Sequence, residues 1–153
     1  MSETFTIFST NKHIEASQAE VFALATDFGR AAEVIRAIEN VEMVTDGPIG
    51  VGTRFLETRT VLGHGTTQEM EVTAFESPSL YTLSCESHGA RYITEVRLVP
   101  NGTGTDVELR FEARPLTFMA KAMAEMLRPM LDSVAGVLEN DLDDLKAALE
   151  RSR

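Results

Sequence analysis

Apolar and polar residues alternate with a period of two along much of the chain between residues 53 and 114. The pattern is clearest at 105–114, where Val107, Leu109, Phe111 and Ala113 share one phase and charged residues fill the other. Such alternation is typical of a strand with one buried face and one face in water. Four further strand-like segments lie between turn residues: 53–62, 66–76, 80–87 and 90–99. Together they predict an antiparallel meander.

Two more strands are expected before the meander's long segments. Phe5–Ile14 is the first, although its apolar residues change phase, which a bulge near Ser9–Asn11 would reconcile. Another begins at Val41–Thr45 and leads into a glycine-rich loop. The sheet therefore has about seven strands.

Two short helices are predicted between these strands. Ser17 followed by Glu20 and an apolar run forms a capping box, so the first helix begins at Gln18. Asp27-Phe28-Gly29 interrupts it, and Ala31–Ile38 can form the second, with Val34, Ile35 and Ile38 on one face.

A long helical pattern closes the chain, from Leu116 to Arg153. Four methionines fall on one of its faces: Met119, Met123, Met126 and Met130. Flexible thioethers laid against a curved sheet can line an adaptable cavity. Ordinary core packing is the alternative interpretation of the same spacing.

Pro129 lies inside this helical pattern, where a missing amide and a steric clash cost about 3 kcal/mol. An unbroken helix of this length would span roughly 55 Å, beyond the ~30 Å width of a small domain. A kink or short break is therefore predicted at Pro129. The apolar stripe continues beyond it with Val134, Leu138, Leu142, Leu145 and Leu149, whereas Asp141, Asp143 and Asp144 are expected to face solvent.

Composition narrows the classes of function. The 153 residues suit one domain, 1–153, and the net charge of −10 argues against nucleic acid as partner. No apolar run is long enough to span a membrane, and the start of the chain lacks the features of a signal peptide, so we expect a cytoplasmic protein. Neither a cofactor nor a metal is implied, because the three histidines lack metal-ligand spacing and Cys85 is the only cysteine.

Several short motifs, in order, carry a resemblance to a known superfamily. They are Ile14-Glu15-Ala16 with Ser17–Phe22, Thr26-Asp27-Phe28, Gly50–Phe55, Val72–Pro78 and Gly104–Val107. With the order of the elements, they resemble the helix-grip fold of the START-related superfamily (SRPBCC), in its polyketide cyclase/dehydrase-like branch. The resemblance implies an α+β fold, with a strongly curved antiparallel sheet around a long C-terminal helix that roofs a pocket.

The expected lining of that pocket combines inward strand positions with the methionine face. It comprises Phe55, Glu57, Arg59, Met70, Val72, Tyr81, Leu83, Cys85, Tyr92, Thr94, Val96, Leu109, Phe111, Met119, Met123, Met126 and Met130. Glu57 and Arg59 are ambiguous, because the strand at 53–62 can turn either this charged pair or a polar face inward. If they point inward, we expect them, with Tyr92 and either Gln68 or Thr94, to orient a ligand's oxygen atoms.

Three functions stay open at this point. The first is binding of a hydrophobic or aromatic small molecule, lipid-, quinone- or polyketide-like, between the sheet and the C-terminal helix. The second is a polyketide cyclase or dehydratase that moves protons with Glu57, Arg59 or Tyr92 in the same cavity. The third is a co-chaperone-like interaction module or a homodimer, which a contiguous apolar patch outside the last helix would favour.

Overall fold

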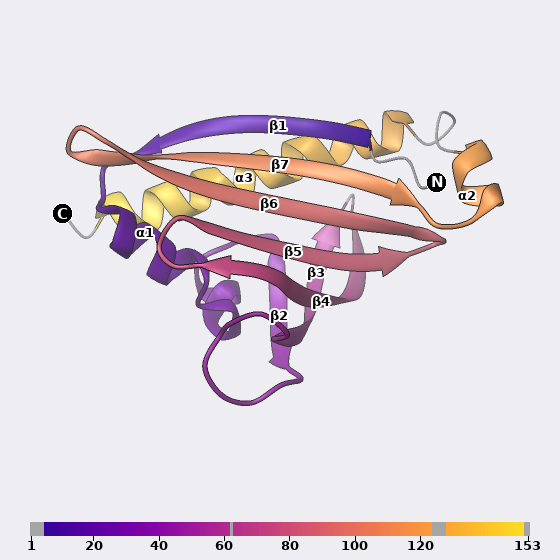
Figure 1. The fold of residues 1–153 in the computed structure, drawn as a ribbon, viewed down its shortest axis with the longest axis horizontal. Coiled ribbons are helices and arrows are strands. Elements are labelled where there is room, and N and C mark those ends of the chain that lie inside the picture. Colours follow the sequence, from indigo (N-terminus) through magenta and orange to yellow (C-terminus); the bar gives the residue numbers. More distant parts are fainter. Residues whose placement is uncertain (1–4, 62, 124–127, 152–153) are drawn as a thin grey trace.

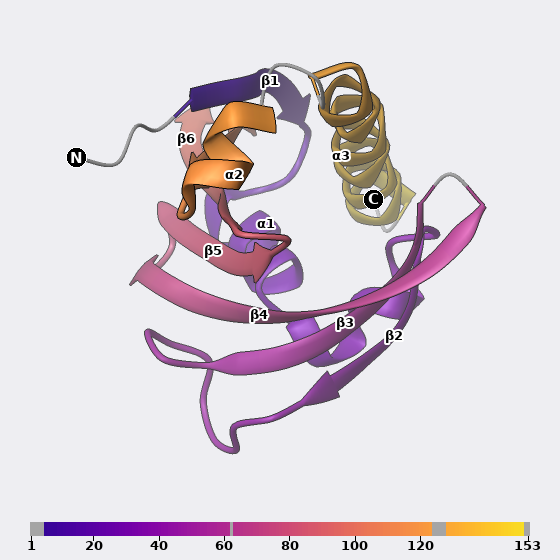
Figure 2. The same ribbon diagram turned by 90° about the vertical axis from the view of Figure 1, so that its right-hand side faces the viewer.

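A single seven-stranded antiparallel sheet wraps around the C-terminal helix (Figures 1 and 2). The computed structural model describes residues 5–61, 63–123 and 128–151. The strands lie in the order β1-β7-β6-β5-β4-β3-β2. Their bounds are β1 (Phe5–Ile14), β2 (Ile38–Met43), β3 (Arg54–Val61), β4 (His64–Glu76), β5 (Leu80–Ser87), β6 (Ala90–Asn101) and β7 (Gly104–Pro115). The predicted fold class, a curved meander around a C-terminal helix, is confirmed.

Four helical segments accompany the sheet. They are α1 (Gln18–Ala25), the 3-10 helix η1 (Phe28–Glu33), α2 (Phe118–Met123) and α3 (Arg128–Arg151). The predicted capping box is confirmed, since Ser17 Oγ accepts from the Glu20 amide at 3.1 Å and Glu20 Oε1 accepts from the Ser17 amide at 3.2 Å. A cap of this kind stabilises the start of a helix by about 1 kcal/mol. In the part of the chain that the structure describes, no helix is long and apolar enough to cross a membrane.

The second short helix lies earlier than the sequence predicts. The prediction of Ala31–Ile38 is wrong, because η1 spans Phe28–Glu33 and Ile38 already begins β2. The reason is the anchoring of Phe28, which is buried and stacks on Phe55 with ring centroids 4.8 Å apart. Phe28, which the sequence placed in the segment between two helices, is thus a core residue.

The bulge in β1 also lies elsewhere. Its register against β7 shifts between Thr6 and Phe8, not at Ser9–Asn11. From Phe8 to Ile14 the strand pairs without interruption, so both residues keep the same phase. The change of phase therefore has to be absorbed before Phe8.

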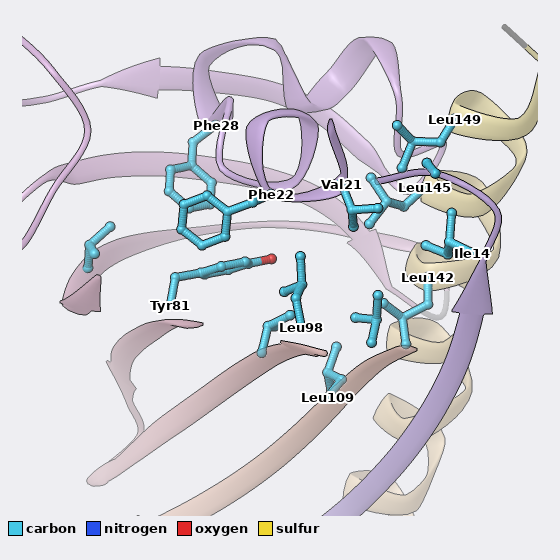
Figure 3. Packing of buried hydrophobic residues seen from close by; sticks show 14 of the residues in the cluster. Ile14, Val21, Phe22, Phe28, Tyr81, Leu98, Leu109, Leu142, Leu145 and Leu149 are labelled. Atoms are coloured by element: carbon cyan, nitrogen blue, oxygen red, sulfur yellow. The ribbon is translucent and has the colours of Figure 1, made fainter. Parts of the chain in front are cut away.

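The core lies between the sheet, α1 and the C-terminal part of α3 (Figure 3). Leu142, Leu145 and Leu149 of α3 are buried in the same cluster as Ile14 and Val21. Burying each of these side chains contributes about 1.5–3 kcal/mol. An aromatic group fills the space beside them, with edge-on or stacked contacts among Phe22, Phe28, Phe55, Phe75 and Tyr81.

Two described helices, α2 and α3, fall within the long helical pattern, and residues 124–127 between them lie outside the described part of the chain. Pro129 is the second residue of α3, and this first turn tolerates a missing amide because its N–H groups have no intrahelical acceptor. The resulting α3 lies between the two edges of the curved sheet (Figure 2). Lys12 Nζ of the edge strand β1 reaches Asp143 at 2.6 Å, and Arg59 of β3, the neighbour of the other edge strand, reaches Asp141 at 2.9 Å, so ion pairs join α3 to both sides of the sheet.

Candidate functional site

The concave face of the sheet changes along the strands from fully packed to half-exposed. Paired residues of an antiparallel sheet point to the same face, so the inward side chains form cross-strand rows. The rows nearer α1 are buried: Tyr81, Val96, Leu98, Val107 and Leu109. Nearer α2, five inward residues are only half-buried: Met70, Leu83, Cys85, Tyr92 and Thr94. Side chains on this part of the concave face therefore retain some exposed surface.

The expected lining residues divide along the same boundary. Six of them pack within the core: Phe55, Val72, Tyr81, Val96, Leu109 and Phe111. Phe111 also supports the half-buried group, since the Tyr92 ring stacks on it with centroids 5.8 Å apart and planes 2° apart. The exposed part of the concave face is thus mainly apolar and packs against the buried core.

A charged cluster stands on this concave side. Alternation from the buried Phe55 turns Glu57 and Arg59 inward, and each of these two side chains is only 15% exposed. Arg59 Nε donates to Glu57 Oε1 at 3.0 Å, and its two terminal nitrogens donate to the two oxygens of Asp141 at 3.1 and 2.9 Å. Of the two orientations left open by the sequence, the inward one is therefore observed.

Asp141 corrects a sequence prediction. It was expected to face solvent, yet its side chain is 16% exposed and makes a two-point contact with the guanidinium of Arg59. Asp144 is a second correction, since its side chain is 11% exposed and pairs with Arg36 at 3.0 Å, whereas Asp143 is 49% exposed. Asp141 stands three residues after Leu138 and four before Leu145, which places it on the buried face of the helix. That spacing was the signal that could have identified it.

The surroundings of the cluster perturb its acidities. Burial raises the pKa of Asp141, and the attraction of Arg59 offsets this rise only in part. Burial alone would lower the pKa of Arg59, but the two neighbouring carboxylates outweigh it and the pKa of the guanidinium rises. With all three groups ionised, the cluster carries one net negative charge.

Two nearby groups on β5 experience the same field. Burial, followed by the charges of Asp141 and Glu57, raises the pKa of Tyr81. Burial and the charge of Glu57 raise the pKa of the Cys85 thiol to about 11. Cys85 is therefore a neutral thiol near pH 7, which agrees with its role as an apolar filler rather than a nucleophile.

The hydroxyl of Tyr81 has no hydrogen-bond partner among the described residues. The residue is 8% exposed, and its ring extends from β5 with the oxygen directed into the interior (Figure 3). Within the described part of the chain, no fully enclosed side-chain oxygen or nitrogen lacks a partner. Its position makes the Tyr81 hydroxyl a candidate polar group of the interior.

The methionine face is not part of this arrangement as predicted. Met119 is 69% exposed and Met123 is 38% exposed, so their placement in the lining is wrong. The physical reason is that α2 is a separate six-residue helix at the end of the sheet (Figure 1), rather than the first turns of the helix that the sheet encloses. Met126 and the side chain of Met130 lie outside the described residues.

The histidines stand apart from the cluster. His13 bridges Glu15 and Asp106 at 2.6 and 2.7 Å on the surface, and His64 and His88 are exposed. Among the described residues, no group of three histidine, cysteine or acidic side chains could hold a metal ion.

Comparison of the sequence with known families gives a match over residues 6–150, to the family described as polyketide cyclase / dehydrase and lipid transport. The chain belongs to this family. The predicted membership of the helix-grip superfamily is thereby confirmed. No curated protein matches the chain in sequence.

Solved structures show the same fold at low identity. The di-domain aromatase/cyclase StfQ from the steffimycin biosynthetic pathway superimposes with a TM-score of 0.78 at 12% identity; the match covers 95% of this chain and 51% of that protein. The ginseng major latex-like protein 151 from Panax ginseng gives 0.74 at 12% identity, with 97% of each chain covered. Norcoclaurine synthase from Thalictrum flavum, in complex with dopamine and hydroxybenzaldehyde, gives 0.71 at 17% identity, covering 99% of this chain and 90% of that one.

The candidate site of this family member has two parts. One is the half-buried apolar surface of β4, β5 and β6, and the other is the Glu57–Arg59–Asp141 cluster with the Tyr81 hydroxyl. Sequence patterns placed Glu57, Arg59 and Tyr81 among the candidates, and missed Asp141. The arrangement can enclose an apolar body while offering hydrogen-bonding groups to one polar end.

Proposed function

We propose that this protein binds a hydrophobic or aromatic small molecule, lipid-, quinone- or polyketide-like, between the concave face of the sheet and α3. One observation carries the proposal: Met70, Leu83, Cys85 and Tyr92 point inward yet stay half-buried. Leaving such side chains in contact with water forgoes about 25 cal/mol for each Å² of apolar surface. A ligand that covers them recovers this free energy, and the family match supports the same kind of function.

The first test is native mass spectrometry of freshly purified protein, in which we expect a co-purified small molecule. A titration with an apolar fluorescent dye, with a naphthalene or anilinonaphthalene body, measures the same site directly. Cys85→Phe fills the accessible surface from β5 and is expected to weaken dye binding at least tenfold. Ser84→Phe is the matched control, because Ser84 is the adjacent residue of similar size on the opposite face.

Binding on the concave face predicts that the two variants differ in dye affinity, whereas a nonspecific dye site predicts no difference. If Cys85→Phe and Ser84→Phe bind the dye equally well, the ligand does not lie on the concave face. If wild-type protein carries no molecule and binds no dye, the proposal is wrong. Melting temperatures of both variants show whether any loss of binding comes from unfolding.

A second candidate is an enzyme of the cyclase or dehydratase type, and Asp141 is the observation that favours it. A carboxyl group with a raised pKa, held by Arg59 near the Tyr81 hydroxyl, has the character of a general acid or base. In a dehydration, the carboxylate of Asp141 would take the proton α to a ketone. The Asp141 carboxyl would then give this proton to the β-hydroxyl, the C–O bond would break to release water, and an enone would form.

The enzymatic candidate has its own assay. The probe 4-hydroxy-4-phenylbutan-2-one loses water to give benzalacetone, whose conjugated chromophore is followed by ultraviolet absorbance. Asp141→Asn is expected to abolish any acceleration while retaining dye binding, and Glu71→Gln on the opposite face of β4 is expected to leave the rate unchanged. If the probe loses water no faster with wild-type protein than in buffer alone, the protein does not catalyse this dehydration.

The described part of α3 does not favour the interaction module. On α3, among the side chains described from 133 to 151, the exposed ones are polar, charged or small: Ser133, Gly136, Glu139, Asn140, Asp143, Ala147 and Arg151. The apolar stripe of this helix faces the sheet instead.

A further inference from the structure

The polar end of the site accepts more hydrogen bonds than it donates. Three of the five N–H bonds of Arg59 already point to carboxylate oxygens of Glu57 and Asp141. Each carboxylate has about four acceptor positions, so the pair retains roughly five after these bonds, against two N–H bonds left on the guanidinium. The Tyr81 hydroxyl adds one donor and two acceptor positions.

The charge of the cluster acts in the same direction. Glu57 and Asp141 contribute two negative charges and Arg59 one positive charge, at side chains that are 15–16% exposed. In so little water, an uncompensated charge is costly and attracts a group of opposite sign. A ligand carboxylate entering here would add a second net negative charge to the site.

From this donor and acceptor inventory, we infer that the bound molecule presents a hydrogen-bond donor, a phenol hydroxyl or a protonated amine, to Glu57, Asp141 and Tyr81, and that carboxylic acids are rejected. The inference rests on the proposed function, because the apolar body of the same molecule lies on the half-buried surface of β4, β5 and β6. A protonated amine gains attraction from the net charge in addition to hydrogen bonds, so it binds more tightly than the phenol.

Three probes with one apolar body test the inference. They are 2-naphthylmethylamine, 2-naphthol and 2-naphthoate, whose intrinsic fluorescence reports binding, at pH 7 and about 0.15 M salt to screen the surface charge. The expected order of affinity is amine, then naphthol, then naphthoate, with at least a tenfold gap between the first and the last. Glu57→Gln keeps an oxygen acceptor for Arg59 while removing one negative charge, and is expected to reduce this gap at least fivefold.

Glu71→Gln is the matched control, since it makes the same change of charge at an exposed residue on the convex face of β4. It is expected to leave the gap unchanged. A gap that Glu57→Gln does not alter, or that Glu71→Gln reduces equally, overturns the inference because the selectivity then comes from the overall charge. The ranking on wild-type protein stands as a test even if a variant fails to fold.

Failure of the inference and failure of the proposed function give different results. If all three naphthalenes bind equally, or if naphthoate binds most tightly, the protein still binds apolar molecules and only the inferred polar end is wrong. If none of the three binds, the proposed function fails together with the inference.

Discussion

Replacing Arg59 by methionine tests the role of the charged cluster in the fold. Methionine keeps a flexible apolar stem and removes the guanidinium, so Asp141 and Glu57 lose their shared counter-charge. Breaking a fully buried pair in this way costs about 3–5 kcal/mol, and breaking an exposed pair costs about 0–1 kcal/mol. Side chains that are 15–16% exposed lie near the buried limit, so we expect a loss of about 2–3 kcal/mol.

Urea denaturation at pH 7 measures this loss as a change in the free energy of unfolding. The same loss would lower the melting temperature by about 4–12 °C in a protein of this size. Arg54→Met is the matched control on the same strand, because Arg54 pairs with Glu69 at 3.7 Å and these side chains are 45% and 50% exposed. We expect less than about 1 kcal/mol for the control. An equal effect of the two substitutions would refute the reasoning.

The pH dependence of Arg59→Met gives a second check with a definite sign. The pKa of Asp141 is raised in the folded protein, so the folded state holds this proton more tightly than the unfolded chain. The cost of ionising Asp141 is therefore absent below its unfolded pKa of about 3.9 and grows as the pH rises through the folded pKa. Without Arg59 the folded pKa rises further, so the deficit of the variant should shrink on acidification from about pH 7 to about pH 4. A deficit that is constant with pH contradicts this account.

Three further predictions concern the rest of the fold. Phe118→Ser should change the free energy of unfolding by less than about 0.5 kcal/mol in urea denaturation, because this side chain is 88% exposed; a larger loss would show that α2 packs onto the core. Gly104→Ala should destabilise the protein strongly, since an added Cβ would overlap the Ile14 carbonyl oxygen, whereas Gly136→Ala meets nothing within 4 Å and should stabilise α3 by up to about 1 kcal/mol, as paired thermal melts can show. The pKa of His13 is raised by hydrogen bonds to its two carboxylate partners, so its stabilising contribution is complete below the unfolded pKa of about 6.5 and is lost as the pH rises through the folded pKa. NMR titration of the His13 ring checks the direction, and His13→Gln should remove that part of the pH dependence of stability.

The strands could be predicted from the sequence because one face of the sheet is buried and the other is wet. Alternation marked all the long strands within a few residues, and glycine-rich turns marked their ends. The β1 bulge was misplaced because two residues of opposite phase show that a bulge exists without fixing where it lies. The second short helix was misplaced because Phe28 acts through distant contacts, with Phe55 and Tyr81, that no local pattern contains.

The site was less predictable than the fold, for a related reason. Periodicity identifies which residues share a face, as it did for Glu57 and Arg59, but not whether that face is covered. The methionines share a helical face in the sequence, and Met119 is nonetheless exposed because it lies on α2, a short helix separate from α3. The charge of Asp141 predicts an exposed residue, although its spacing from Leu138 and Leu145 puts it on the buried stripe.

The inward position of Glu57, Arg59 and Asp141 is difficult to explain by stability alone. Apolar residues of similar size in place of a buried ion pair are often neutral or stabilise a protein by about 1–4 kcal/mol. The neighbouring inward residues Phe55 and Leu142 are apolar and buried, so the same positions could hold an apolar core. A charged cluster at such positions, beside a half-buried apolar surface and a tyrosine hydroxyl with no hydrogen-bond partner among the described residues, is the arrangement expected when an interior is adapted to hold the polar end of a ligand rather than to fold most stably.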